Sequence, residues 1–133
     1  MEPTALADTY RAYVDCLNAR DWARLGDFVD EHAVHNGRAL GLAGYRAMLE
    51  ADVRAIPDLR FEIALLACQP PIVACRLRFD CTPAGELFGL RVDGRRVRFD
   101  EHVFYEFAQG RIRQVWSVID QAAIAAQLAS PAP

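Results

Sequence analysis

The stretch from Phe99 to Asp120 places the strongest constraint on the fold. It reads FDEHVFYEFAQGRIRQVWSVID, with an apolar run on each side of Gln109-Gly110. Two strand-forming runs joined by two turn residues, the second of them glycine, predict a β-hairpin. A turn at these two residues sets the cross-strand pairs: Phe107 with Ile112, Val103 with Trp116, and Phe99 with Asp120.

Side chains alternate between the two faces of a strand, so one face of this hairpin is large and apolar. Its members in chain order are Phe99, Glu101, Val103, Tyr105, Phe107, Ile112, Gln114, Trp116, Val118 and Asp120. The two carboxylates lie near the open end as diagonal neighbours, roughly 7–8 Å apart at the backbone. An apolar wall that carries a few ionisable groups is typical of a small-molecule pocket. We therefore expect five of these side chains to form cavity walls that contact a ligand: Phe99, Val103, Tyr105, Trp116 and Val118.

The composition excludes several classes of function. A net charge of −3 provides no electrostatic footprint for nucleic acid, and no run of eighteen apolar residues predicts a membrane span. The acidic, amphipathic N-terminus does not resemble a signal peptide. All fifteen basic residues are arginine, which excludes Schiff-base chemistry at a lysine. The four cysteines show neither CxxC spacing nor histidines at ligand spacing, so we expect buried thiols in a reducing cytoplasm and no metal site.

The order of elements predicts an α+β fold in one domain with a core over about residues 8–128. Apolar residues at helical spacing predict helices over about 4–18, 21–29 and 41–55, and Pro57 stops the third. Residues 30–37 form a short extended or turn segment between the second and third helices. Strands over 59–68 and 72–80, a glycine-rich loop over 83–94 and the hairpin follow, then a helix over 121–128 and a frayed SPAP tail. The helices would pack on one face of a four-stranded antiparallel sheet. If strongly curved, such a sheet would form a cone-shaped α+β barrel around an apolar cavity.

Five segments in register resemble the SnoaL-like family of the nuclear transport factor 2-like superfamily. They are LNARDWARL, AVHNG, AIPDLRFEI, GELFGLRVDGRRVRF and EFAQGRIRQVWSVID. The resemblance implies a curved sheet with a deep apolar cavity, a homodimer and no cofactor. It also implies polyketide-cyclase chemistry, in which an acid/base aspartate at the end of the last strand closes a ring by intramolecular aldol condensation. Asp120, ten residues after Gly110, matches that aspartate.

The chain departs from this pattern at several positions. The cyclases' histidine, seven positions before the hairpin glycine, is replaced by Val103, and the common His-Trp-Asp element is Val115-Trp116-Ser117. Steroid isomerases of the superfamily need an aspartate where Asn36 stands and an acid at Val103. Steroid isomerase chemistry is therefore not expected.

Asp120 and Glu101 are the first two catalytic candidates. An apolar site raises the pKa of a carboxyl toward neutrality, which suits proton abstraction beside a carbonyl. Asp120 can equally be the N-cap of the helix that begins at Gln121, because aspartate is favoured there. Glu101 would share the cavity as its coupled partner. If the register slips by one residue, His102 faces the pocket in place of Glu101.

Four further residues complete the predicted site. His35 is the third catalytic candidate, with Asn36 beside it as a substrate-binding residue, although a buried histidine bonded to backbone is the commoner case. Tyr10 and Tyr13, a turn apart on the first helix, can offer a hydroxyl to an enolate oxygen or simply belong to the core. Ser117 is expected to point away from the pocket, and a serine hydrolase is excluded.

The outer face of the hairpin is expected to carry Phe104, Val115 and Ile119. An apolar stripe that no helix covers predicts a homodimer through the outer sheet face. The partner in the cavity would be a small apolar molecule, polyketide-like or another carbonyl compound. Three functions remain open: a cofactor-independent, polyketide-cyclase-like enzyme, a non-catalytic small-molecule binding protein, and a hydrolase of an epoxide or lactone.

Overall fold

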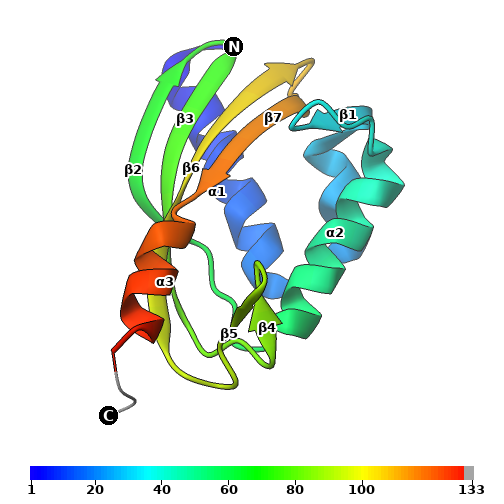
Figure 1. Ribbon diagram of the computed structural model, residues 1–133. Helices are drawn as coiled ribbons and strands as arrows, with labels where there is room; N and C mark the ends of the chain where they lie inside the picture. Colours follow the sequence, from blue (N-terminus) through cyan, green and yellow to red (C-terminus); the bar gives the residue numbers. More distant parts are fainter. Residues whose placement is uncertain (131–133) are drawn as a thin grey trace.

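The computed structural model of the protein describes residues 1–130 (Figure 1). The last three residues of the predicted frayed tail lie outside the described residues. The elements, in chain order, are α1 (Pro3–Ala19), the 3₁₀ helix η1 (Trp22–Asp27), β1 (Val29–His35), α2 (Gly41–Ala55), β2 (Glu62–Gln69), β3 (Ile72–Cys81), β4 (Glu86–Leu87), β5 (Leu90–Arg91), β6 (Val97–Ala108), β7 (Arg111–Ile119) and α3 (Gln121–Leu128).

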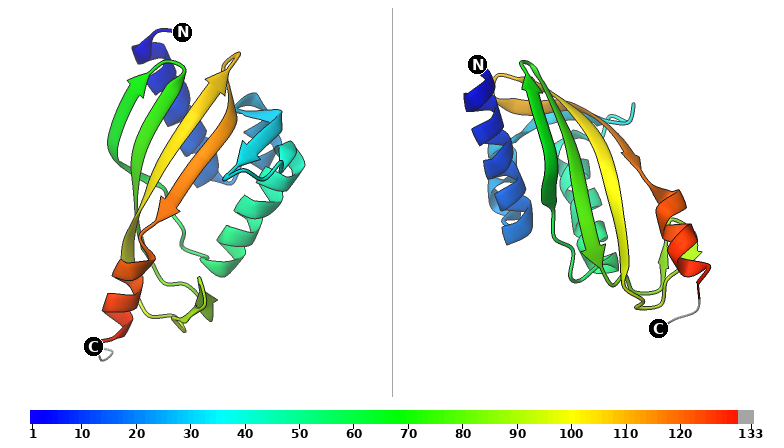
Figure 2. Two further views of the ribbon diagram at one scale, coloured as in Figure 1. Left: turned by 45° about the horizontal axis from the view of Figure 1, so that its top comes forward. Right: turned by 90° about the vertical axis from the view of Figure 1, so that its left-hand side faces the viewer.

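A curved, five-stranded sheet forms the body of the molecule, in the order β1-β7-β6-β3-β2. Strands β2, β3, β6 and β7 pair antiparallel as the predicted meander. The fifth strand, β1, comes from the segment expected to be extended or a turn, and it pairs with β7 in parallel. Helices α1 and α2 lie on the concave side of the sheet, which is not closed, and α3 follows the end of β7 (Figures 1 and 2). The predicted α+β class, with helices packed on a curved sheet, is confirmed.

Two helical predictions meet different outcomes. Helix α2 spans Gly41–Ala55, as the periodicity and Pro57 predict. The predicted second α-helix is instead a 3₁₀ helix that ends at Asp27, and Val29 already belongs to β1.

The predicted loop over 83–94 contains the two short strands β4 and β5. None of the helices within the part of the chain that the structure describes is long and apolar enough to cross a bilayer.

The core fills the space between α1, α2 and the concave face of the sheet. Alternation along β3 places Val73, Cys75, Leu77 and Phe79 inside and charged residues outside. Helix α1 buries an apolar stripe against the same face, with Leu6, Tyr10, Tyr13, Val14 and Leu17 each at most 4% exposed. Cys16, Cys75 and Cys81 are buried and Cys68 is half-buried, all as free thiols.

The β6–β7 hairpin has the predicted turn but not the predicted register. Gln109 and Gly110 both have positive φ, 53° and 78°, the conformation of a tight two-residue hairpin turn. Phe107 pairs with Ile112 as expected. The next pair is Glu106 with Gln114, so Arg113 is an extra residue on β7 and forms a β-bulge.

This bulge reverses the faces of β7 beyond Arg113. Val103 lies opposite Ser117, not Trp116, and Glu101 lies opposite Ile119, so the predicted pairs of Val103 with Trp116 and Phe99 with Asp120 are wrong. A shift of one residue exchanges the inner and outer side chains of a strand. Trp116 and Val118 consequently lie on the outer face, 41% and 69% exposed.

Candidate functional site

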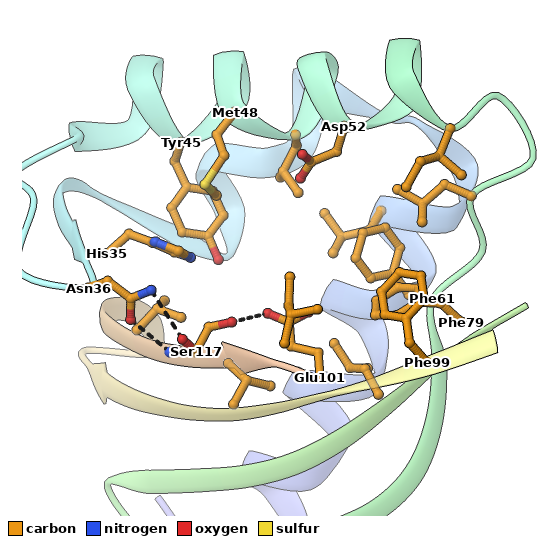
Figure 3. A pocket seen from close by; sticks show the side chains of 18 of the residues that line it. His35, Asn36, Tyr45, Met48, Asp52, Phe61, Phe79, Phe99, Glu101 and Ser117 are labelled. Carbon is orange, nitrogen blue, oxygen red and sulfur yellow. Dashed lines mark hydrogen bonds between the residues drawn. The ribbon is translucent and has the colours of Figure 1, made fainter. Parts of the chain in front are cut away.

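A cavity of about 360 Å³ lies between the helices and the concave face of the sheet. This volume is near the lower end of the roughly 300–1,000 Å³ typical of small-molecule pockets. Leu87 and Phe88, from the β4–β5 hairpin, also line it. Figure 3 shows two different ends. The polar end carries His35, Asn36, Tyr45 and Ser117, the aromatic end carries Phe61, Phe79 and Phe99, and Asp52 and Glu101 lie between them.

Glu101 extends from the inner face of β6 into the cavity, while His102 is exposed on the outer face. The Ser117 hydroxyl donates a hydrogen bond to Oε2 of Glu101. Burial raises the pKa of the Glu101 carboxyl; the bond from Ser117 opposes this rise and the nearby Asp52 adds to it. The structure therefore offers a carboxyl whose basicity exceeds that of an exposed glutamate.

Asp52, on α2, is a cavity residue that the sequence analysis missed. Its carboxyl faces the cavity, and partial burial there raises its pKa to about 6 (Figure 3). Asp52 is nevertheless exposed to solvent. The signal was its helical position: Asp52 follows Tyr45 and Met48 on the face of α2 that lines the cavity.

Tyrosine hydroxyls provide further uncharged polar groups at the site. Tyr13 of α1 and Tyr45 of α2 share a hydrogen bond of 2.7 Å between their hydroxyl oxygens. Burial raises the pKa of both hydroxyls, so they remain protonated and can donate. Tyr10 has no exposed surface, does not line the cavity, and donates to the Tyr105 hydroxyl at 3.3 Å. The predicted contact of Tyr10 with a ligand is therefore wrong, because Tyr10 is fully buried and does not line the cavity.

His35 and Asn36 follow each other at the end of β1 and both line the cavity. Burial lowers the pKa of His35, with a further contribution from Arg38, so its imidazole is neutral near pH 7. The ring meets the Tyr45 ring edge-on, with centroids 6.1 Å apart. The Asn36 amide is bonded to the backbone of Ser117, accepting from its N–H at 2.8 Å and donating to its carbonyl at 3.2 Å.

The β-bulge removes three predicted residues from the site and brings Val115, Ser117 and Ile119 into it. Asp120 is exposed and caps α3, accepting a hydrogen bond from the Ala123 N–H at 3.1 Å, so its predicted place in the cavity is wrong. Trp116 and Val118 are outside as well, so their predicted role as walls is wrong. Ser117, expected to point away, lines the cavity. The predicted wall residues Phe99, Val103 and Tyr105 precede the bulge and do line it.

Within residues 1–130 no three His, Cys, Asp or Glu side chains gather in a way that could hold a metal ion. The side chains that line the cavity supply carboxyl, hydroxyl, amide and imidazole groups. A carboxyl with raised pKa beside protonated tyrosines can accept a proton while a hydroxyl stabilises the oxygen that becomes negative.

Comparisons with known proteins agree with this architecture. The family profile described as SnoaL-like polyketide cyclase matches residues 7–128. A crystal structure of a SnoaL-like polyketide cyclase from Agrobacterium tumefaciens is 52% identical, with a TM-score of 0.93, over 96% of this chain and 99% of that one. A search of curated proteins finds no significant match.

Two more distant crystal structures share the fold. AclR from Streptomyces galilaeus, a candidate hydroxylase, is 22% identical with a TM-score of 0.79, over 98% of this chain and 100% of its own. IdmH from Streptomyces antibioticus, a candidate polyketide cyclase, is 20% identical with a TM-score of 0.81, over 94% of this chain and 99% of its own. At these identities the likeness concerns the fold alone, since one fold supports many chemistries.

Proposed function

The chain belongs to the SnoaL-like polyketide cyclase family, and we propose that it is an enzyme that moves protons on a small apolar carbonyl compound without a cofactor. The reaction the family favours is an intramolecular aldol condensation of the polyketide-cyclase type. The observation that carries the proposal is the Glu101 carboxyl, which lies in an apolar cavity with a raised pKa.

In this reaction Glu101 replaces Asp120 as the base. Its carboxylate removes a proton from the carbon beside a carbonyl, and the Tyr45 or Tyr13 hydroxyl donates a hydrogen bond to the resulting enolate oxygen. The enolate carbon attacks a second carbonyl of the same molecule and forms the new carbon–carbon bond. The alkoxide produced takes a proton from Glu101, which regenerates the carboxylate. The cavity walls hold the two carbons close together, which lowers the barrier by orienting them.

The alternative is a small-molecule binding protein that uses the same cavity without turnover. Val103 favours it, because it replaces the histidine of the cyclases with a side chain that can neither donate nor accept a proton. A hydrolase of an epoxide or lactone would use Glu101 and Asp52 to activate water. These functions differ in what happens to a bound carbonyl compound, and one experiment separates them.

The test is hydrogen–deuterium exchange at the α-carbon of diketones and aromatic polyketide analogues in D₂O, followed by NMR, with one epoxide and one lactone included. We expect exchange with the wild-type protein and a loss of roughly 10²–10⁴-fold in Glu101→Gln, the usual contribution of a general base. Asp120→Asn is the matched control, because it removes an exposed carboxylate and should retain the activity. Ligand-induced shifts without exchange would establish the binding function instead, and ring opening would establish the hydrolase.

We also propose that the protein forms a homodimer through the outer face of the sheet. Val115 and Ile119, expected there, lie inside, and the bulge puts Trp116 and Val118 on the outer face in their place. With Phe104, which pairs with Trp116, they form an exposed apolar patch in which each residue is at least 41% exposed. Sedimentation should give a dimer mass that Trp116→Glu reduces to the monomer mass. A wild-type monomer at all concentrations would contradict the dimer.

A further inference from the structure

Strand β7 runs past the end of its parallel neighbour. Strand β1 ends at His35, which pairs with Val115, while β7 continues to Ile119. The Asn36 N–H bonds the Val115 carbonyl at 2.8 Å, and its side-chain amide then bonds both backbone groups of Ser117. The amide thus supplies the donor and the acceptor that the backbone of a longer β1 would have supplied.

The residue held in this way is the one that bonds Glu101. Ser117 lies opposite Val103, so its side chain is a diagonal neighbour of Glu101 on the inner face of the sheet. Its hydroxyl donates to Oε2 of Glu101. Ser117 therefore links the two residues: its backbone bonds the Asn36 amide, and its hydroxyl bonds the Glu101 carboxylate (Figure 3).

We propose that Asn36 and Ser117 are positioning residues: Ser117 orients the Glu101 carboxylate, and Asn36 acts on Glu101 through Ser117 rather than by binding the substrate. This rests on the proposed function only in taking Glu101 as the proton-transfer group. The amino and carbonyl groups of the Asn36 amide both bond the backbone of Ser117, so we assign Asn36 no contact with the substrate.

The residue type at position 36 fits this role. The backbone there has a φ of 48°, in the left-handed region, which asparagine adopts more readily than most other side chains. An aspartate of the same shape could accept from the Ser117 N–H but could not donate to its carbonyl. The amide is therefore the side chain that closes both bonds in this conformation.

A second asparagine offers a matched control. Asn18, at the end of α1, donates to the Phe61 carbonyl at 2.9 Å and accepts from the Phe61 N–H at 2.7 Å. These two hydrogen bonds match those that Asn36 makes to Ser117. Phe61, however, has no polar side chain and makes no bond to Glu101. Asn18→Ala therefore reproduces the loss of two backbone bonds without the connection to the carboxylate.

The experiment measures the pKa of Glu101 by ¹³C NMR of its carboxyl carbon, which needs no substrate. The other titratable groups around this carboxyl are kept unchanged in every variant: Asp52, Tyr13, Tyr45, Cys75, Tyr105 and His35. Because the hydrogen bond from Ser117 lowers the pKa of Glu101, Ser117→Ala should raise that pKa by about one pH unit. Ser117→Thr, which keeps the hydroxyl, should restore the wild-type value.

Asn36→Ala should raise the pKa of Glu101 in the same direction and by less. The double variant Asn36→Ala/Ser117→Ala should match Ser117→Ala alone, because the effect of Asn36 passes through the serine. Asn18→Ala should lower the melting temperature to a similar degree and leave the pKa of Glu101 unchanged. An Asn36→Ala variant with the wild-type pKa would overturn the role of Asn36, and a Ser117→Ala variant with the wild-type pKa would overturn the whole proposal.

The two proposals fail in different ways. If Glu101→Gln leaves proton exchange intact, the proposed function is wrong, even when the pKa shifts show that the residues hold the carboxylate. If the pKa shifts are absent while Glu101→Gln abolishes exchange, the function stands and the positioning does not. Should Asn36→Ala fail to fold, Ser117→Ala still tests the proposal, since it leaves both backbone bonds of Asn36 in place.

Discussion

The two ends of the cavity are each held by one asparagine, with the same pair of backbone hydrogen bonds and different consequences. At the aromatic end Asn18 bonds the backbone of Phe61, whose ring packs edge-on against that of Phe79 with the centroids 5.4 Å apart. At the polar end Asn36 holds Ser117, whose hydroxyl bonds Glu101. One asparagine thus fixes an apolar wall, and the other fixes a group that acts on a carboxylate.

This comparison separates stability from chemistry within one small cavity. Phe61, Phe79 and Phe99 are at most 8% exposed, and burial of such side chains stabilises the fold. Glu101 and Asp52 are held in surroundings that raise their pKa values, which disfavours their charged forms. Removal of an aromatic side chain should therefore act mainly on folding, and removal of the Ser117 hydroxyl mainly on proton transfer.

The largest expected difference lies between Phe79→Ala and Ser117→Ala. Removing the buried ring should lower the free energy of unfolding by about 3–5 kcal/mol, whereas removing the hydroxyl should lower it by about 1 kcal/mol. Urea unfolding followed by circular dichroism measures both. Equal losses would show that the polar end also carries the fold, and the separation of roles would be wrong.

The losses of stability on substituting the two asparagines should be more similar to each other. Asn18→Ala and Asn36→Ala each remove two hydrogen bonds to backbone groups, and each should lower the free energy of unfolding by roughly 1–3 kcal/mol. The same unfolding experiment compares them directly. A much smaller loss for Asn36→Ala would mean that water replaces its bonds, as its exposed position permits.

The smallest expected effect is the pH dependence due to Asp52. Its pKa in the fold, about 6, is above the ordinary value of 3.8, so its contribution to stability is fully present below pH 3.8 and is lost as the pH rises through about 6. Wild-type protein should therefore lose stability relative to Asp52→Asn across this range, by an amount limited by the access of solvent to the cavity. Melting temperatures measured from pH 3.5 to 7.5 test this, and parallel curves for the two proteins would contradict it.

Much of the fold could be predicted because it depends on local patterns. The helix over Gly41–Ala55, the turn at Gln109-Gly110 and the alternation along β3 all appear in the structure as the residues indicate. These features follow from helical periodicity, from turn chemistry and from one face of a strand being apolar. The parallel pairing of β1 could not be predicted in this way, since its partner is about eighty residues away in the chain.

The site depended on a detail that the sequence leaves open. In β7 both alternating sets are apolar enough to face inward: Trp116 with Val118, or Val115 with Ile119. The pattern alone therefore does not choose a face, and a single bulge at Arg113 in the curved sheet makes the choice. That choice moves Asp120 to the cap of α3 and brings Ser117 to Glu101. The sequence by itself determined that the chain builds an apolar cavity with a carboxyl from β6, and only the tertiary structure decided which side chains of β7 and α2 accompany it, because register and the packing of α2 are set by contacts between distant segments.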